Sequence, residues 1–151
     1  MKSLFTFLVV VASALTQPVL AANGKIFDGK SAHAKATANF VSTYQGTDGI
    51  WDASGNTTEV LFFWHNQLMD SYYDVNGDLI GTFHNVEASS LPAGALKQIG
   101  ADYKGYEIKS TSVMEKDGQA PVYFVTVQSP ARMFILEVNK AGEVNVYKTV
   151  R

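Results

Sequence analysis

The sequence predicts an α+β fold in which a unit of one helix followed by antiparallel strands is used twice, forming one broad antiparallel sheet with two helices on one face. The first observation is the order of segments, because residues 38–86 and 91–150 both run from a helical segment through a Tyr and a Gly-containing break into strand-like runs. The second is a local match between residues 72–76 (YYDVN) and 135–139 (ILEVN). The repeats are expected at about 31–88 and 89–151, as one supersecondary unit used twice around a shared core.

Two helices are expected, one in each repeat. Residues 31–44 contain several alanines and begin at Ser31, a suitable N-cap, and Ala36, Phe40, Val41 and Tyr44 are the predicted buried stripe. The second helix is expected to open at Leu91-Pro92 and to end before Gly105, since proline is tolerated in a first helical turn. Its expected apolar face consists of Ala95, Leu96, Ile99 and Tyr103.

Eight strands are expected, because runs rich in β-branched and aromatic residues alternate with turns that contain Gly, Asn or Pro. The expected strands span 50–53, 58–65, 68–75, 79–86, 106–115, 122–128, 132–138 and 143–150. A tight break is expected at Asn66-Gln67, and Asn76-Gly77 predicts a hairpin turn in which both residues tolerate positive φ.

The N-terminal residues have the pattern of a secretion signal, with Lys2, an apolar run at 4–15 and a small-residue cleavage site near Ala21. We therefore expect residues 1–21 to be removed, leaving a single exported domain at 22–151 in the periplasm or outside the cell, with no membrane attachment. A polar leader at 23–30, loose or an edge strand, is expected to precede the first helix.

The composition narrows the possible partners and chemistry. The chain has 12 Lys and Arg against 14 Asp and Glu, a net charge of −2, and Lys2 lies in the expected signal. No basic cluster occurs, so nucleic acid is not an expected partner. The chain has no Cys, which excludes disulfides, thiolate catalysis and Cys-ligated metals.

The order of the motifs resembles that of exported bacterial proteins of the PepSY-like and β-lactamase-inhibitor-protein-like (BLIP-like) families. The residues that carry the resemblance are Leu91-Pro92, Ile99, 103–108 (YKGYEI), 122–125 (VYFV) and Gly142, with Trp51 and 73–80 (YDVNGDLI) in the first repeat. The resemblance implies a non-enzymatic exported domain, because the inhibitor relatives bind a protein through the open sheet face and PepSY domains restrain proteases. The chain lacks the disulfides typical of the inhibitors.

Several chemical sites were considered, and none is predicted. Residues 74–78 (DVNGD) have the start of a calcium loop without its later carboxylate, which favours a plain hairpin turn. His33, His65 and His84 lack the paired spacing of a zinc site, and no strained serine elbow occurs. We expect no catalytic residue, no metal and no cofactor. The alternatives left open are an exported hydrolase that uses Asp70, Asp74 and Glu137, and a structural envelope protein without a specific ligand.

The central strands are apolar on both faces, which is the main indication of function. Alignment of the repeats places Val60, Phe62, Trp64, Tyr73 and Val75 with Tyr123, Val125, Val127, Leu136 and Val138 beneath the helices. The opposite face is expected to bind a protein or peptide, which could be an exported enzyme or a second copy of the chain. The alternatives are that a second layer, such as the leader, covers this face, or that its apolar residues reflect β-propensity alone. The expected anchors on that face are Phe63, Tyr72, Phe124, Met133, Ile135 and Tyr147.

Overall fold

The computed structural model describes residues 29–54 and 56–150, and the expected signal and most of the leader lie outside these residues. The described helices are α2 (Gly29–Thr43) and α3 (Ala95–Asp102), with a short 3₁₀ helix η1 (Ala88–Ser90). The strands are β1 (Gly49–Ser54), β2 (Thr57–Trp64), β3 (Gln67–Tyr73), β4 (Leu79–Asn85), β5 (Glu107–Glu115), β6 (Val122–Gln128), β7 (Met133–Val138) and β8 (Val144–Val150). They form one eight-stranded antiparallel sheet in the order β1 to β8, so the predicted α+β fold is confirmed.

The chain divides into two compact units between Thr82 and Phe83, within β4. The first unit comprises the described residues up to Thr82 and contains α2 and β1–β3. The second unit comprises residues 83–150 and contains α3 and β5–β8. Each unit is a helix followed by antiparallel strands, and each has its own cluster of buried apolar side chains.

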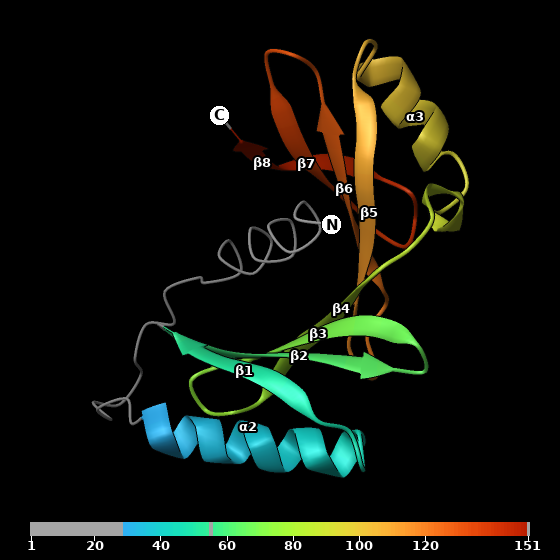
Figure 1. Cartoon of the computed structure of the whole chain (residues 1–151). Helices are drawn as coiled ribbons and strands as arrows, with labels where there is room; N and C mark the ends of the chain where they lie inside the picture. Colours follow the sequence, from blue (N-terminus) through green and yellow to red (C-terminus); the bar gives the residue numbers. More distant parts are fainter. Residues whose placement is uncertain (1–28, 55, 151) are drawn as a thin grey trace. The chain divides into compact units, whose positions relative to one another are not determined.

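In the first unit, α2 covers one face of the strands (Figure 1). Ala36 and Phe40 are buried on the helix, and Phe40 packs edge-on against Phe62 with ring centroids 4.9 Å apart. Tyr44 packs on the same Phe62 ring at 4.5 Å. The expected stripe is wrong at Val41, which is 54% exposed. Its position one residue after Phe40 turns it about 100° away from the line of residues spaced four apart.

Four of the five residues of the first unit that were predicted to lie beneath the helix do so. Val60, Phe62 and Tyr73 are buried in the cluster with Met69, and Trp64 is partly buried against it. Val75 is the exception, because it lies in the turn after β3 instead of in a strand. The helix itself begins at Gly29, so Ser31 is an internal helix residue and Gly29 and Lys30 do not belong to a loose leader.

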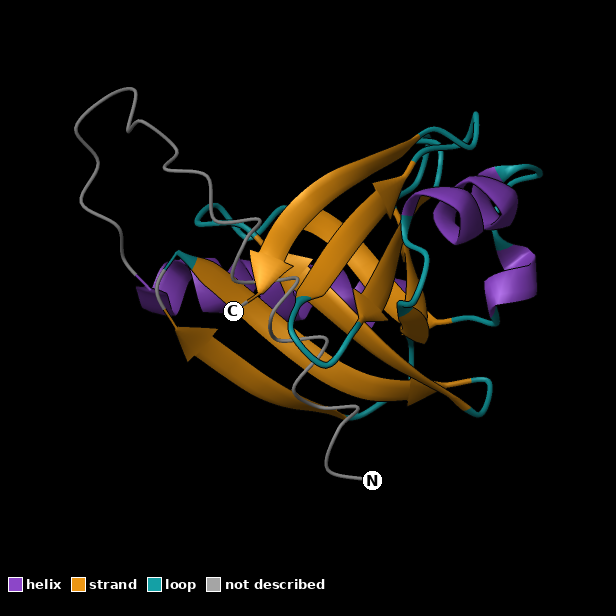
Figure 2. Ribbon diagram, turned by 90° about the horizontal axis from the view of Figure 1, so that it is seen from above, coloured by secondary structure: helices purple, strands orange, loops and turns teal. Residues whose placement is uncertain are grey.

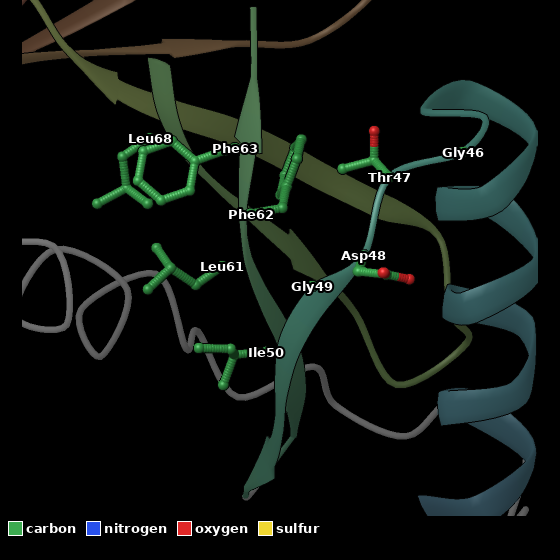
Figure 3. A pocket seen from close by; sticks show the side chains of 9 residues that line it. All are labelled: Gly46, Thr47, Asp48, Gly49, Ile50, Leu61, Phe62, Phe63 and Leu68. Carbon is green, nitrogen blue, oxygen red and sulfur yellow. The ribbon is translucent and has the colours of Figure 1, made fainter. Parts of the chain in front are cut away.

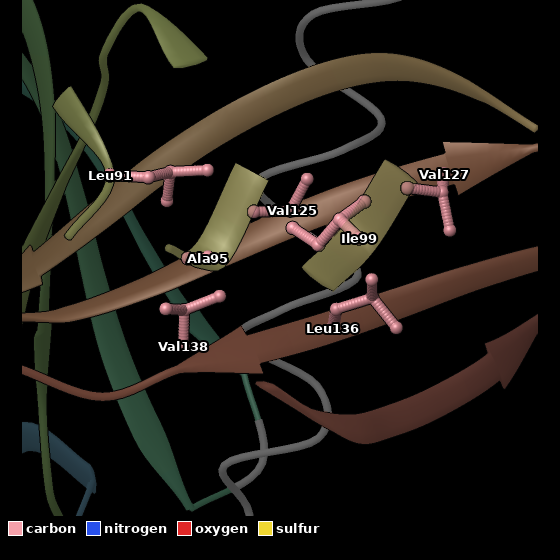
Figure 4. Close-up of a cluster of buried hydrophobic side chains, with 7 residues drawn as sticks. All are labelled: Leu91, Ala95, Ile99, Val125, Val127, Leu136 and Val138. Carbon is pink, nitrogen blue, oxygen red and sulfur yellow. The ribbon is translucent and has the colours of Figure 1, made fainter. Parts of the chain in front are cut away.

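In the second unit, α3 and η1 lie together beside the strands (Figure 2). Ala95 and Ile99 of α3 are buried in one cluster with four residues of β6 and β7, namely Val125, Val127, Leu136 and Val138 (Figure 4). Tyr123 is partly buried against this cluster, so the predicted helix-side face is confirmed here too. Tyr103 packs against Phe134 with ring centroids 5.7 Å apart.

The start of the second helix differs from the expectation. Leu91-Pro92 precedes the helix, and the first helical residue is Ala95, whose N–H donates to the carbonyl of Pro92 at 3.1 Å. Gly94 adopts φ 92°, a conformation that a side chain would strain, and this residue separates the turn from the helix. Leu96 is 41% exposed, so it does not belong to the buried face.

The two units use the same side-chain-capped hairpin turn. In the first unit, Oδ1 of Asp74 accepts hydrogen bonds from the N–H groups of Asn76 at 2.8 Å and Asp78 at 2.9 Å. In the second unit, Oδ1 of Asn139 accepts from Ala141 at 2.9 Å and Glu143 at 3.1 Å. Asp74 therefore corresponds to Asn139, whereas the sequence alignment paired Asp74 with Glu137. The alignment was wrong by two residues, and a shift of two keeps every side chain on its face.

Two further turns correct the sequence prediction. At 74–78 only Gly77 has positive φ, at 75°, which makes a turn followed by a left-handed glycine instead of a turn with both Asn76 and Gly77 left-handed. The tight turn between β2 and β3 consists of His65 (φ 48°) and Asn66 (φ 63°), one residue earlier than expected. Asn is the residue that tolerates this conformation best after glycine.

Candidate binding surface on the face without a helix

In the first unit, the face opposite α2 is built from alternate residues of β1, β2 and β3. Backbone pairing places Ile50 opposite Leu61, and Leu61 opposite Asp70. Phe63 lies opposite Leu68. Because successive side chains of a strand point to opposite faces, these residues point away from the buried Val60 and Phe62. We call Ile50, Asp52, Glu59, Leu61, Phe63, Leu68, Asp70 and Tyr72 the first helix-free face.

One end of the first helix-free face is apolar and exposed. Ile50 is 75% exposed and Phe63 is 68% exposed, the two highest values among the large apolar residues described as exposed. Figure 3 shows Ile50, Leu61, Phe63 and Leu68 on one side of the strands, with Phe62 on the side of α2. Exposed apolar residues that adjoin one another are typical of interaction sites, whereas single ones are common on any surface.

A hollow of about 680 Å³ opens beside these residues at the start of β1 (Figure 3). Its lining consists of Gly46, Thr47, Asp48, Gly49, Ile50, Leu61, Phe62, Phe63 and Leu68. Gly49 is required where β1 passes over the core, because a Cβ there would come closer to Cγ2 of Val60 than normal van der Waals contact allows. The missing side chain at Gly49 therefore lets β1 lie close to the core at the edge of the hollow.

The other end of the face holds a buried carboxyl group. Asp70 is 1% exposed, and its Oδ2 accepts a hydrogen bond from the hydroxyl of Tyr72 at 2.7 Å. Its Oδ1 has no hydrogen bond of normal geometry to residues 29–54 and 56–150, although the carboxyl group of Glu59 lies close enough to interact with Asp70. Burial is the main cause that raises the pKa of Asp70 to about 8, and the nearby Glu59 raises it further, whereas the Tyr72 hydrogen bond opposes the shift. Asp70 is therefore mostly protonated at neutral pH.

The three acids of the alternative hydrolase site have separate structural roles. Asp70 is buried and bonded to Tyr72, and Asp74 caps its own turn. Glu137 belongs to β7 of the second unit, where it pairs with Phe124 and Asn145. None of the three lines the hollow. Neither the hollow nor the capped turn gives these acids a shared place to act on a substrate.

The three histidines also lie in different settings. The ring of His33 on α2 packs edge-on against Trp51 with centroids 5.1 Å apart, and His65 stacks on Trp64 at 4.7 Å. His84 lies on β4, where burial is the main cause that lowers its pKa. Within residues 29–54 and 56–150, no three His, Asp or Glu side chains are grouped in a way that could hold a metal ion.

The six expected anchors differ widely in exposure. Phe63 is 68% exposed, and Met133 and Tyr147 are partly buried. Tyr72, Phe124 and Ile135 are 1–2% exposed, so the expectation that these three lie open on the surface is wrong. Their part in binding is untested and stays a prediction.

The second unit shows why Phe124 is buried. Its ring packs against Phe83 at 5.9 Å and against Tyr147 at 5.1 Å, so the aromatic side chains of three strands cover one another. Backbone pairing between β7 and β8 shifts from Ile135–Lys148 to Leu136–Val146, which leaves Tyr147 as the extra residue of a β-bulge. A bulge bends its strand and redirects the side chain. The sequence pattern contained no sign of this contact.

Sequence reasoning missed Ile50, the most exposed large apolar residue of the surface. Ile50 and Trp51 are adjacent and both apolar, and the structure places them on opposite faces. Two adjacent apolar residues at the start of an edge strand are the sequence signal for this arrangement, because successive side chains of a strand point to opposite faces.

The fold is that of an α+β protein with a broad antiparallel sheet, and several solved structures share it. A DUF2874 family protein from Bacteroides uniformis has a similar structure with a TM-score of 0.67 at 13% identity, covering 78% of this chain and 88% of its own. A BLIP-like protein from Bacteroides fragilis has a TM-score of 0.62 at 14% identity, covering 84% of this chain and 89% of its own.

A third similar structure is a protein from Bacteroides eggerthii that is provisionally assigned to the periplasm, with a TM-score of 0.66 at 10% identity, covering 77% of this chain and 87% of its own. No family model matches the chain, and no curated protein matches its sequence. At these identities the likeness concerns the fold alone. It confirms the BLIP-like part of the sequence resemblance as a fold, whereas the PepSY-like part stays a prediction.

The lengths and compositions of the described helices indicate whether any of them could span a membrane. None of those in residues 29–54 and 56–150 combines the length and the apolar composition that a membrane-spanning helix requires.

Proposed function

We propose that the chain is an exported, non-enzymatic binding domain that binds a protein or peptide through its helix-free surface. The observation that carries the proposal is a group of adjoining apolar residues on a sheet face that α2 leaves uncovered. Ile50 and Phe63 are exposed there, and Leu61 and Leu68, which pair with them, are partly buried. Export is supported by the signal-like N-terminus and by the periplasmic assignment of one similar structure. The BLIP-like fold of another is consistent with binding.

Phe63 is the principal anchor in this proposal, because it is the most exposed of the six expected residues. Full burial of a side chain of this size stabilises a complex by about 1.5–3 kcal/mol. Met133 and Tyr147, both partly buried, are the corresponding proposed contacts within the second unit. Tyr72, Phe124 and Ile135 act from beneath the surface, where they fix the positions of the residues that make contact.

The test begins with a partner isolated on the immobilised mature chain from the envelope and medium of the exporting cell. The partner is then purified, and its affinity is measured by calorimetry for the wild type and for Phe63→Ser. We expect Phe63→Ser to weaken binding at least tenfold, which corresponds to about 1.4 kcal/mol. Val41→Ser is the matched control, because Val41 is also an exposed apolar residue of the first unit but lies on α2.

Equal binding by wild type and Phe63→Ser would show that this surface is not the site. Met133→Ser examines the contribution of the second unit in the same assay. Thermal unfolding of each variant separates a lost contact from a lost fold. Turnover of a peptide, glycan or ester substrate that disappears on Asp70→Asn would instead favour the hydrolase alternative, and a failure to find any saturable partner would favour a structural envelope protein.

A further inference from the structure

The free edge of β1 adjoins the exposed apolar residues of the first helix-free face. β1 is the first strand in the order of the sheet, and β2 is its one partner among the described residues. An edge strand presents unpaired backbone N–H and C=O groups, which can pair with a further strand. The hollow lined by Ile50 and Phe63 opens at the start of this same strand.

The side chains along β1 define which strand would fit. Side chains that lie opposite one another form rows across the strands, and Ile50 lies in one row with Leu61. Asp52 lies in the next row on the same face, with Glu59 and Tyr72. Ile50 and Asp52 are both exposed, and Asp52 forms no ion pair with any residue that the structure describes. An added strand would therefore meet an apolar row and, two residues along, an acidic row.

From this arrangement we propose that the partner, in the binding function proposed above, adds an extended segment to the edge of β1. That segment carries an apolar side chain beside Ile50 and a Lys or Arg beside Asp52, two residues apart on one face. Side chains directly opposite in neighbouring strands have Cβ atoms about 4.5–5.5 Å apart, close enough for both contacts. The backbone ladder supplies affinity, and the two side chains supply specificity.

A second copy of this chain fits the edge less well. In antiparallel pairing of two β1 strands, the register that sets Trp51 opposite its own copy would place Asp52 beside Ile50 instead of beside a basic residue. The register that sets Asp52 opposite its own copy would place the two carboxylates side by side on one face. Like charges at that spacing destabilise strand pairing, and acidic edge residues commonly prevent it. Charge therefore favours a basic partner segment over self-association.

The experiment selects dodecapeptides from a random phage-displayed library on the immobilised mature chain. We expect enrichment of an apolar residue and a Lys or Arg separated by one residue. The best peptide is synthesised with a fluorescent label, and its affinity is measured by anisotropy. Ile50→Ser and Phe63→Ser should each weaken binding at least tenfold, Val41→Ser should stay within twofold, and Asp52→Asn should reduce the preference for the basic peptide over its Glu analogue.

Backbone N-methylation of the peptide tests the added strand directly, because it removes a hydrogen-bond donor and leaves the side chains in place. Every second N–H group of an added strand points toward β1, and methylation of these groups should abolish binding. Methylation of the N–H groups in between, which point away from β1, should be tolerated. The proposal would be overturned if both sets of methylated peptides lost affinity equally, or if the library showed no enriched pattern of apolar and basic residues. A dimer in sedimentation velocity that Ile50→Ser dissociates would overturn it in favour of a second copy. Binding that appears after deletion of residues 23–28 alone would assign the edge to the chain's own leader.

The two proposals can fail separately. Phe63→Ser could weaken the affinity for the purified partner, as measured by calorimetry, while both sets of methylated peptides bind equally well. In that case the binding function stands and strand addition is wrong. If Phe63→Ser leaves the affinity for that partner unchanged, the binding surface itself is wrong.

Discussion

Replacement of Asp70 by Asn tests the buried carboxyl group of the first unit and gives a defined pH dependence. The pKa of Asp70 is raised from 3.8 to about 8, chiefly by burial. Between these values the folded chain keeps the proton and the unfolded chain loses it. The stability that the protonated carboxyl contributes is therefore complete below about pH 4 and is lost as pH rises toward 8.

The size of this effect follows from the shift. Each pKa unit corresponds to about 1.4 kcal/mol, so the free energy of unfolding should fall by about 4 kcal/mol between pH 4 and pH 7. That is a large part of the 5–15 kcal/mol typical of a domain. An Asn side chain stays neutral, and its amide oxygen can accept the Tyr72 hydroxyl as Oδ2 of Asp70 does. We expect Asp70→Asn to be similar in stability to the wild type at pH 4 and more stable than it by about 5 kcal/mol at pH 8.

The assay is urea unfolding followed by tryptophan fluorescence from pH 4 to pH 9. Trp51 and Trp64 both pack against the buried cluster of the first unit, so the signal reports on the part of the chain that contains Asp70. The reasoning is refuted if Asp70→Asn retains the pH slope of the wild type, or if it is less stable than the wild type at pH 8. Either result would mean that the folded chain holds Asp70 ionised.

Four further substitutions test the packing and the turns by urea unfolding at pH 5. Gly49→Ala should lower stability by about 1–3 kcal/mol, because its new methyl group would overlap Val60. Ile99→Ala should cost about 2–5 kcal/mol by leaving a cavity in the second cluster. Asp74→Ala should cost about 1.5–3 kcal/mol and Asn139→Ala about 1 kcal/mol, because the first turn loses hydrogen bonds to a charged acceptor and the second loses hydrogen bonds to a neutral one.

Each of these predictions has a contradicting result. An unchanged urea midpoint for Gly49→Ala would mean that β1 can move away from the core. A loss below 1 kcal/mol for Ile99→Ala would mean that α3 contributes little to the second cluster. Asp74→Asn keeps an acceptor oxygen and serves as the control for the first turn, so it should retain most of the stability that Asp74→Ala loses.

The strands and their buried faces could be predicted from sequence because side-chain alternation has a period of two. The alignment of the repeats was wrong by two residues at Asp74 and Asn139, and this error left every strand residue on its predicted face. A shift of one residue would have reversed both faces. The buried faces of the helices were predicted less accurately, because each step along a helix turns the side chain by about 100°. Val41 and Leu96, each adjacent to a buried residue, are exposed.

The exposure of the candidate site residues could not be predicted from alternation. Phe124 is covered by Phe83 and Tyr147, and that contact depends on a bulge that has no local sequence signature. Burial of Asp70 was equally hidden, because an acid on a strand normally points to solvent. Alternation identifies the face of a residue, whereas its exposure depends on which residues from distant parts of the sequence pack over that face.

Hydrogen–deuterium exchange of the mature chain with and without its purified partner tests the central claim most directly, because it reports contact along the whole backbone without any substitution. If the partner binds the first helix-free face through the edge of β1, the amides of β1 and β2 become protected and those of α2 keep their exchange rates. Protection confined to α2 or α3, with β1 and β2 unchanged at saturating partner, would contradict the account.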